Sequence, residues 1–184
     1  MIQSAGVVCP GRLPARMHHH AYVTRDMAAT RRFYEDLIGL PLVATWCEQD
    51  VLFGKQRTYA HCFFALKDGS ALAFFQFADP SDQAEFGPQM PASPFHHIAL
   101  NTDKDSLQAL KKRVEDAGLQ GTYILEHGYC HSLYVTDPNG LIVEFTLDDA
   151  AAPEWNRKRK ADAHSELKRW LGGDHTPNNI PNNA

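Results

Sequence analysis

Residues 96–118, HHIALNTDKDSLQALKKRVEDAG, repeat the pattern of residues 19–39, HHAYVTRDMAATRRFYEDLIG. Each stretch opens with a His-His pair in a strand-like run and continues with apolar residues at helical spacing up to a glycine. Between them lies an aspartate that can cap a helix, Asp26 in the first copy and Asp103 or Asp105 in the second. An internal repeat of this length constrains the architecture more than any single motif does. The two stretches therefore predict two copies of one folding unit.

Three segments of strand-like composition follow the helical segment in each copy. They are residues 41–49, 57–66 and 70–78 in the first copy and residues 119–126, 130–136 and 140–147 in the second. Lys67-Asp68-Gly69 supplies the last turn of the first copy, and Asp137-Pro138-Asn139-Gly140 supplies that of the second. The sequence thus predicts an α+β protein made of two tandem βαβββ modules.

The segments outside the repeat complete the predicted organisation. We expect a flexible extension over 1–16, a two-module domain over 17–150 with modules 17–78 and 95–148, a helix over 151–171 and a loose tail over 172–184. Residues 79–94, rich in Pro, Gly and acidic residues, link the modules. The C-terminal helix carries an apolar stripe of Ala163, Leu167, Trp170 and Leu171, which should pack on the sheets or on a second subunit. We predict a homodimer on this basis.

The composition is that of an ordinary globular protein. Of 184 residues, 43% are hydrophobic and 22% are charged, which excludes intrinsic disorder and collagen-like structure. No run of 18 apolar residues and no signal-peptide-like region occurs, so we expect a cytoplasmic protein without a membrane partner. A net charge of -4 gives no footprint for nucleic acid. The four cysteines form no C-x-x-C pair, and Cys62 and Cys130 are most simply small core residues.

A single carboxylate, Glu144, interrupts the apolar run Leu141–Phe145 of the last predicted strand. A buried carboxylate is costly unless it is paired or bound to a metal, so this position needs a partner. The His-His pairs at the start of each module can provide one. Two histidines and one carboxylate form the facial triad associated with non-haem iron(II), and zinc, manganese or nickel can also accept it.

These motifs resemble those of the vicinal oxygen chelate superfamily, which includes glyoxalase, fosfomycin-resistance proteins, bleomycin-binding proteins and extradiol dioxygenases. The resemblance covers residues 17–148 and is carried by residues 32–40, residues 95–100 and the Asp137-Pro138-Asn139-Gly140 turn before Glu144. It implies that the modules form a curved mixed sheet around a metal site with His19, His97 and Glu144 as ligands. The aspartate that caps the helix follows His19 by seven residues and His97 by six, so alignment on it would favour His20 over His19.

Many relatives take a fourth ligand from the last strand of the first module. Here Ala73 stands where that ligand is expected, so the resemblance implies three protein ligands, as in extradiol dioxygenases and fosfomycin enzymes. Gln76 could restore a fourth ligand if the strand register differs by three residues.

Residues 127–144, HGYCHSLYVTDPNGLIVE, look like the extradiol dioxygenase signature, although Leu125 departs from it. Ring cleavage of a catechol needs a base for one hydroxyl proton and a donor near the oxygen, and His and Tyr suit both tasks. The resemblance therefore implies catalytic roles for Tyr134 and His127, with His61 as a further acid or base. A cross-strand aromatic role for Tyr134 and ordinary core or surface roles for the two histidines remain alternatives.

The function expected from these residues is extradiol-type cleavage of a catechol-like small molecule by O2, with Fe(II) as the favoured divalent metal. The alternatives are a glyoxalase-like lyase or isomerase, a thiol transferase, and a non-catalytic small-molecule-binding resistance protein. The last would not need His19, His97 and Glu144 together. Oxygen dependence separates ring cleavage from the lyase, isomerase and transferase reactions, because those reactions need only Lewis-acid polarisation.

Overall fold

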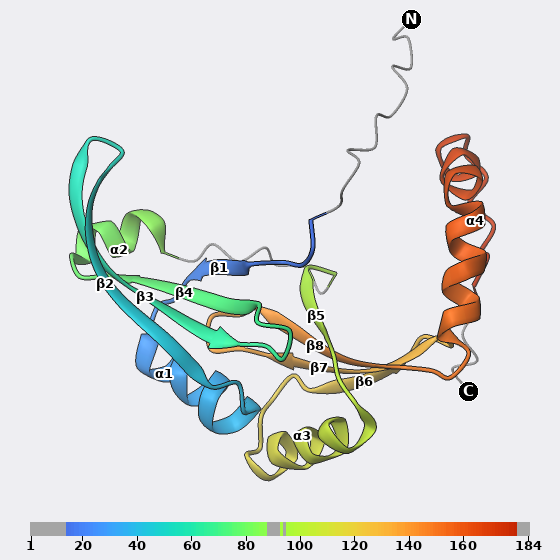
Figure 1. Ribbon diagram of the computed structural model, residues 1–184, viewed down its shortest axis with the longest axis horizontal. Coiled ribbons are helices and arrows are strands. Elements are labelled where there is room, and N and C mark those ends of the chain that lie inside the picture. The colour runs from blue at the N-terminus through green and yellow to red at the C-terminus, as the bar shows by residue number, and fades with distance from the viewer. Residues whose placement is uncertain (1–13, 88–92, 94, 180–184) are drawn as a thin grey trace, which may run out of the picture. The chain divides into compact units, whose positions relative to one another are not determined.

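The computed structural model describes residues 14–87, 93 and 95–179 (Figure 1). The chain divides into two units, Met1–Pro88 and Gln89–Ala184. Each unit contains one of the two predicted βαβββ modules, and each module forms its own four-stranded mixed sheet. Most of the predicted extension over 1–16 and the end of the predicted tail lie outside the described residues.

The first unit begins with the module over residues 19–77 and ends with a short additional helix. Its elements are β1 (His19–Val23), α1 (Met27–Arg31), the π-helical turn η1 (Arg32–Ile38), β2 (Leu42–Leu52), β3 (Lys55–Ala65), β4 (Ala71–Phe77) and α2 (Pro80–Phe86). The strand order is β1-β4-β3-β2. β1 pairs with β4 in parallel, and the other two pairings are antiparallel.

Helical residues cover one face of this sheet, with Thr30 of α1 and apolar positions of η1 buried. Tyr34 is fully buried, and its ring contacts the rings of Phe64 and Phe74 at centroid distances of 5.5 and 4.9 Å. Asp26 caps α1 by accepting a hydrogen bond from the Ala29 amide, as its sequence position predicts. The opposite face of the sheet is free of these helices.

The second unit repeats the arrangement. Its elements are β5 (His97–Asn101), α3 (Lys104–Asp116), β6 (Tyr123–Glu126), β7 (Cys130–Thr136), β8 (Ile142–Asp148) and α4 (Ala152–Leu171). The strand order is β5-β8-β7-β6, with β5 parallel to β8. Asp103 caps α3, whose Leu110 and Val114 are buried, and Figure 1 shows α3 beneath this sheet.

The predicted C-terminal helix is present as α4 and extends beyond the end of its sheet (Figure 1). Its apolar stripe stays largely exposed among the described residues of the second unit, with Leu167 and Trp170 each 56% exposed and Leu171 76% exposed. Of the two expectations for this helix, packing on the sheets is therefore not seen for the sheet of its own unit. Among the described residues, no helix is long and apolar enough to cross a membrane.

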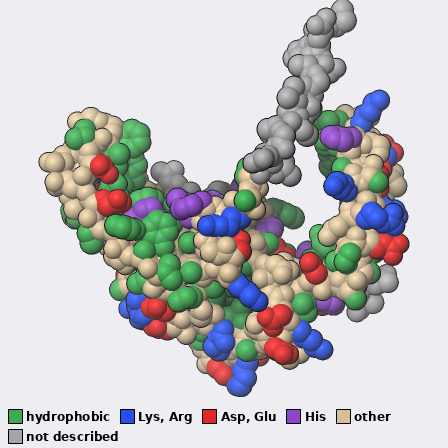
Figure 2. Space-filling model, in the orientation of Figure 1, with side chains coloured by type: hydrophobic (Ala, Val, Ile, Leu, Met, Phe, Trp, Pro, Cys, Tyr) green, Lys and Arg blue, Asp and Glu red, His purple; other side chains and the backbone are tan. Residues whose placement is uncertain are grey.

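Two features of the first unit differ from the sequence expectations. The β2–β3 hairpin reaches further than predicted, and Figure 2 shows hydrophobic side chains at the surface along it. Val51 and Phe53 of this hairpin are exposed. The expected linker contains α2, which Asp79 caps through the Ser81 amide. Asp82 of α2 is buried and pairs with the buried Arg57 on β3, so an acidic residue that suggests a solvated linker instead fixes a helix to the sheet.

Candidate metal centre

Corresponding positions of the two modules can be identified from strand register alone. Five residues separate the last paired positions of β3 and β4, Ala65 and Ala71, and five separate Thr136 and Ile142 of β7 and β8. Counting along the strands from these pairs makes Ala73 the counterpart of Glu144. Ala73 and Glu144 each pair with one residue of a parallel edge strand, Ala73 with β1 and Glu144 with β5. The residue two positions before that pairing partner is His19 in β1 and His97 in β5.

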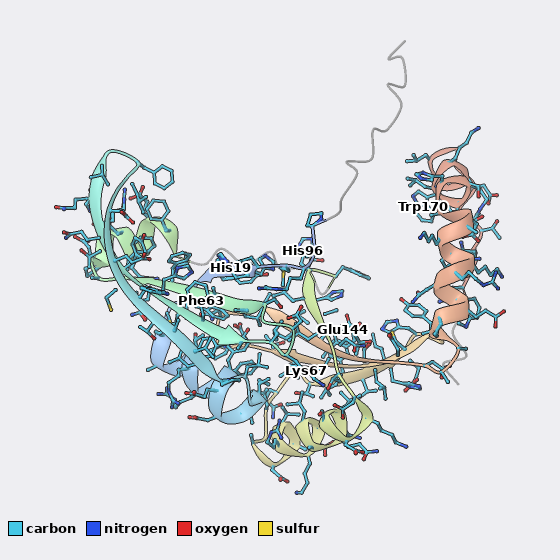
Figure 3. All side chains as sticks on the ribbon, viewed as in Figure 1. His19, Phe63, Lys67, His96, Glu144 and Trp170 are labelled. Atoms are coloured by element: carbon cyan, nitrogen blue, oxygen red, sulfur yellow. The ribbon has the colours of Figure 1, made fainter. Side chains whose placement is uncertain are left out.

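This register resolves the choice between His19 and His20 in favour of His19 as the counterpart of His97. His20 lies on the helix-covered side, where its ring centroid is 4.5 Å from that of Tyr22 and its Nδ1 lies 3.1 Å from the Tyr22 hydroxyl. His19 lies on the opposite side, with its ring 5.4 Å from that of Phe63 (Figure 3). Adjacent strand residues point to opposite faces, so only one of the two histidines can share the face that corresponds to Glu144.

The same alternation decides between the candidates for a fourth ligand. Ala73 faces the same side as His19 and carries no donor. Gln76 faces the helix-covered side, where its Oε1 accepts a hydrogen bond of 2.7 Å from the Met27 amide and so helps to hold the start of α1. The alternative in which Gln76 supplies a ligand does not fit this geometry.

Glu144 is 6% exposed and has polar partners on two sides. Its Oε2 lies 2.9 Å from His97 Nε2 on the neighbouring parallel strand, and its Oε1 accepts a hydrogen bond of 2.5 Å from Ser132 Oγ on β7. The predicted need of this carboxylate for partners is therefore met by residues of the second unit. Ser132 was not singled out from the sequence, although its spacing of two residues from Tyr134 puts it on the same face of β7.

Tyr134 lies directly opposite Glu144 in the β7–β8 ladder, as the ten-residue spacing predicts. Its hydroxyl is 3.0 Å from His127 Nε2, and its ring stacks on Tyr123 with a centroid distance of 4.7 Å. Burial, together with a hydrogen bond to Glu144, raises the pKa of Tyr134 far above its ordinary value. Tyr134 therefore remains a neutral phenol at physiological pH, able to donate a hydrogen bond.

His61 lies in the first unit on the face that carries His19. Its ring stacks on Phe75 at 3.7 Å and lies 5.8 Å from the His19 ring. Burial lowers the pKa of His61, and the nearby His19 lowers it further, so the ring is neutral at pH 7. Its buried Nε2 has no hydrogen-bond partner within the part of the chain that the structure describes. Such an atom is available to a ligand or to a water molecule.

The predicted site residues thus fall into two groups. His97, Glu144, Tyr134 and His127 are connected by polar contacts within the second unit, and His19 and His61 are neighbours in the first.

The arrangement matches a known protein family. Residues 16–145 match the model of the Glyoxalase/Bleomycin resistance protein/Dioxygenase superfamily, and the chain belongs to this family. The resemblance seen in the sequence motifs is thereby confirmed at the level of the superfamily.

Solved structures share the fold at low sequence identity. A glyoxylase/bleomycin resistance protein/dioxygenase domain from Frankia sp. EAN1pec matches with a TM-score of 0.55 and 16% identity over 76% of this chain and 95% of that one. A glyoxalase/dioxygenase from Nostoc punctiforme matches with a TM-score of 0.53 and 24% identity over 78% of this chain and 97% of that one. The fosfomycin resistance protein FosX from Listeria monocytogenes matches with a TM-score of 0.55 and 14% identity over 76% of this chain and 98% of that one. Among curated proteins, no significant match is found.

Proposed function

We propose that the chain is a metal-dependent enzyme acting on a small molecule, with His19, His97 and Glu144 as the ligands of one divalent ion. The observation that carries this proposal is the 2.9 Å approach of His97 Nε2 to Glu144 Oε2. Two ligand atoms each about 2.1 Å from an ion and about 90° apart are about 3.0 Å from each other. The donor atoms therefore already have the spacing of two adjacent ligands, and His19 is the register counterpart that would supply the third.

The donor set also fits the chemistry of such an ion. Two imidazoles and one carboxylate leave coordination positions open for a substrate, and the set suits iron(II) while also accepting manganese, zinc or nickel. Ser132 holds one oxygen of Glu144 and leaves the other for the ion. Hydrogen bonds of this kind orient a ligating carboxylate and raise metal affinity.

The reaction that we propose first is extradiol-type opening of a catechol-like ring by O2 with Fe(II). Bound iron would supply Lewis acidity and electron transfer between catechol and oxygen. Both oxygen atoms enter the ring-opened product, so no external reductant is consumed.

The surrounding side chains would handle protons in this reaction. His127 can accept a proton from a catechol hydroxyl, because an imidazole nitrogen is the most common general base of enzymes. Tyr134 keeps its proton and donates a hydrogen bond beside Glu144, while its contact with His127 fixes the imidazole ring. His61, neutral and with a buried nitrogen that has no partner among the described residues, is proposed as a second base on the face that carries His19.

The test uses oxygen as the discriminating reagent. Fe(II)-loaded protein is mixed anaerobically with a panel of catechols, O2 is admitted, and oxygen uptake and the yellow ring-opened product are followed together. Tyr134→Phe keeps the ring that stacks on Tyr123 and should lower turnover by about 10²- to 10⁴-fold. His164→Ala, on an exposed position of α4, is the matched control and should behave as the parent.

A second candidate is a lyase, isomerase or transferase reaction that needs only Lewis-acid polarisation. The observation that favours it is Ala73, since a set of three protein ligands is expected for fosfomycin enzymes as well as for extradiol dioxygenases. FosX from Listeria monocytogenes, a structural neighbour with 14% identity, has been solved with Mn(II) and 1S,2S-dihydroxypropylphosphonic acid. Turnover of methylglyoxal hemithioacetal or of a thiol-epoxide pair under argon, with no oxygen uptake on any catechol, would replace the dioxygenase proposal with this one.

A further inference from the structure

A second group of metal-ligating side chains lies in the second unit, and it shares Glu144 with the first. A ring nitrogen of His127, Sγ of Cys130 and a carboxylate oxygen of Glu144 all lie within 4.8 Å of one another. Cys130 and Glu144 are each 6% exposed, and His127 is half-buried. The group therefore combines a nitrogen, a sulfur and an oxygen donor in a largely buried setting.

The local fold explains why these three residues meet. The His127 amide donates a hydrogen bond of 3.0 Å to the Cys130 carbonyl and closes a four-residue turn, with Gly128 in the left-handed region at φ 82°. Cys130 then starts β7, where strand alternation places it on the same face as Ser132. Cys130 Sγ lies 3.8 Å from Ser132 Oγ, which in turn donates to Glu144 Oε1. The turn and the strand thus hold all three donors without any residue of the first unit.

The two oxygens of Glu144 point to different partners. Oε2 is directed to His97, whereas Oε1 is directed along β7 to Ser132, the neighbour of Cys130. We propose that His127, Cys130 and Glu144 form a second metal site, one that takes a thiophilic divalent ion such as zinc and competes with the His97 site for the Glu144 carboxylate. The competition rests on the proposed function, but the existence of the sulfur-containing site does not.

The donor chemistry defines which ions this site prefers. Zinc is bound tetrahedrally by Cys, His and carboxylate ligands, and three protein ligands leave one position for water. Zinc also binds nitrogen and sulfur donors more tightly than iron(II) or manganese(II) does. An ion in this position would occupy His127, which the proposed reaction needs as a base. The site would therefore act as an inhibitory zinc site beside the catalytic one.

The test reads the sulfur ligand directly with cobalt(II). Metal-free, reduced protein is titrated with Co(II), and the near-ultraviolet absorption that arises from thiolate-to-cobalt charge transfer is recorded. Because loss of an outer-shell partner already costs about 10- to 100-fold in metal affinity, Cys130→Ser should weaken this Co(II) binding by at least about 100-fold and abolish the absorption. Cys62→Ser, which changes a buried free thiol of the first unit, is the matched control and should keep both the Co(II) affinity and the absorption.

Two further variants separate this proposal from the proposed function. His97→Ala should keep the Co(II)–thiolate absorption while losing Mn(II) binding, which is followed separately by electron paramagnetic resonance. His127→Ala should lose the Co(II)–thiolate absorption while keeping Mn(II) binding. Far-ultraviolet circular dichroism of each variant establishes that it is folded.

The outcomes are decisive in both directions. Absorption that disappears in Cys130→Ser and His127→Ala, and persists in His97→Ala and Cys62→Ser, supports a separate site. Its absence from the parent, its persistence in Cys130→Ser, or its loss in His97→Ala overturns the proposal. If every variant still binds Mn(II), the result would instead count against the metal ligands of the proposed function.

Discussion

Replacing Ser132 by alanine should weaken metal binding without touching a metal ligand. Ser132 is 1% exposed, and its hydroxyl donates to Glu144 Oε1 over 2.5 Å. Loss of an outer-shell hydrogen bond to a ligand costs about 10- to 100-fold in affinity. Tenfold corresponds to about 1.4 kcal/mol, so the binding free energy should fall by about 1.4 to 2.8 kcal/mol. The stability of the metal-free protein should fall by about 1 to 3 kcal/mol, because a buried acceptor loses its donor.

The assay is a calorimetric titration of metal-free protein with Mn(II), with urea unfolding of the same samples. Thr146→Val is the matched control, because Thr146 faces Ser132 in the β7–β8 ladder and its buried Oγ1 has no partner among the described residues. That variant should bind Mn(II) as the parent does and should unfold with equal or slightly greater free energy. If folded Ser132→Ala binds Mn(II) as tightly as the parent does, Ser132 does not orient Glu144 for an ion.

Three other perturbations have expected outcomes. Asp82→Ala should lower the free energy of unfolding by about 3 to 5 kcal/mol in urea titrations, because it leaves the buried Arg57 without its buried partner. A hydrogen bond to Asp50, with burial, raises the pKa of Tyr59 to about 12. The absorbance of the Tyr59 phenol should therefore show its ionisation near pH 12 and not near the ordinary tyrosine pKa of about 10. The free energy of unfolding should fall as the pH rises from about 10 to about 12. Trp170→Ala should shift the homodimer that we predict towards monomer in light-scattering measurements.

Each of these has a control and a contrary result. Glu85→Ala removes the half-exposed partner of Arg57 and should cost less than about 1 kcal/mol, so equal losses at Glu85 and Asp82 would contradict the importance of burial. Tyr59→Phe should abolish the loss of stability between pH 10 and 12 that is attributed to Tyr59. A monomeric mass for the parent protein would remove the homodimer prediction and leave the apolar stripe of α4 unexplained.

Much of the fold could be predicted because the signals are local. The capping aspartates Asp26 and Asp103, the turns at 67–69 and 137–140 and the alternation of each strand depend on residues within a few positions of one another. α2 could not be predicted in this way. Its attachment depends on Asp82 meeting Arg57, 25 residues away, and composition alone makes the segment resemble a solvated linker.

The ambiguity between His19 and His20 has a specific physical origin. Three residues separate β1 from α1, but only two separate β5 from α3. Counting back from the capping aspartate therefore measures the length of the connection and misaligns the strands by one residue. In a strand, one residue reverses the face of the side chain, and only the pairing of β1 with β4 shows which histidine shares the face of Ala73.

Ser132 and Cys130 were missed as site residues for a different reason. Serine and cysteine are common in buried strands, and their meaning here depends on the cross-strand position of Glu144. The extradiol-like signature identified Tyr134 because that pattern contains a tyrosine at this position. The smaller polar residues two and four positions earlier on the same face become informative only once the register is known.

The alanine at position 73 also determines the charge that a filled metal site would carry. Ala73 is fully buried, and its counterpart Glu144 supplies the one carboxylate of the proposed ligand set. A divalent ion held by that carboxylate and two neutral imidazoles keeps one net positive charge, whereas a second carboxylate at position 73 would cancel it. In the proposed site, this remaining charge would favour substrates that bind as anions, because such a substrate neutralises the ion. If His19, His97 and Glu144 share an ion as proposed, the buried methyl group of Ala73 would set the electrostatic preference of that ion.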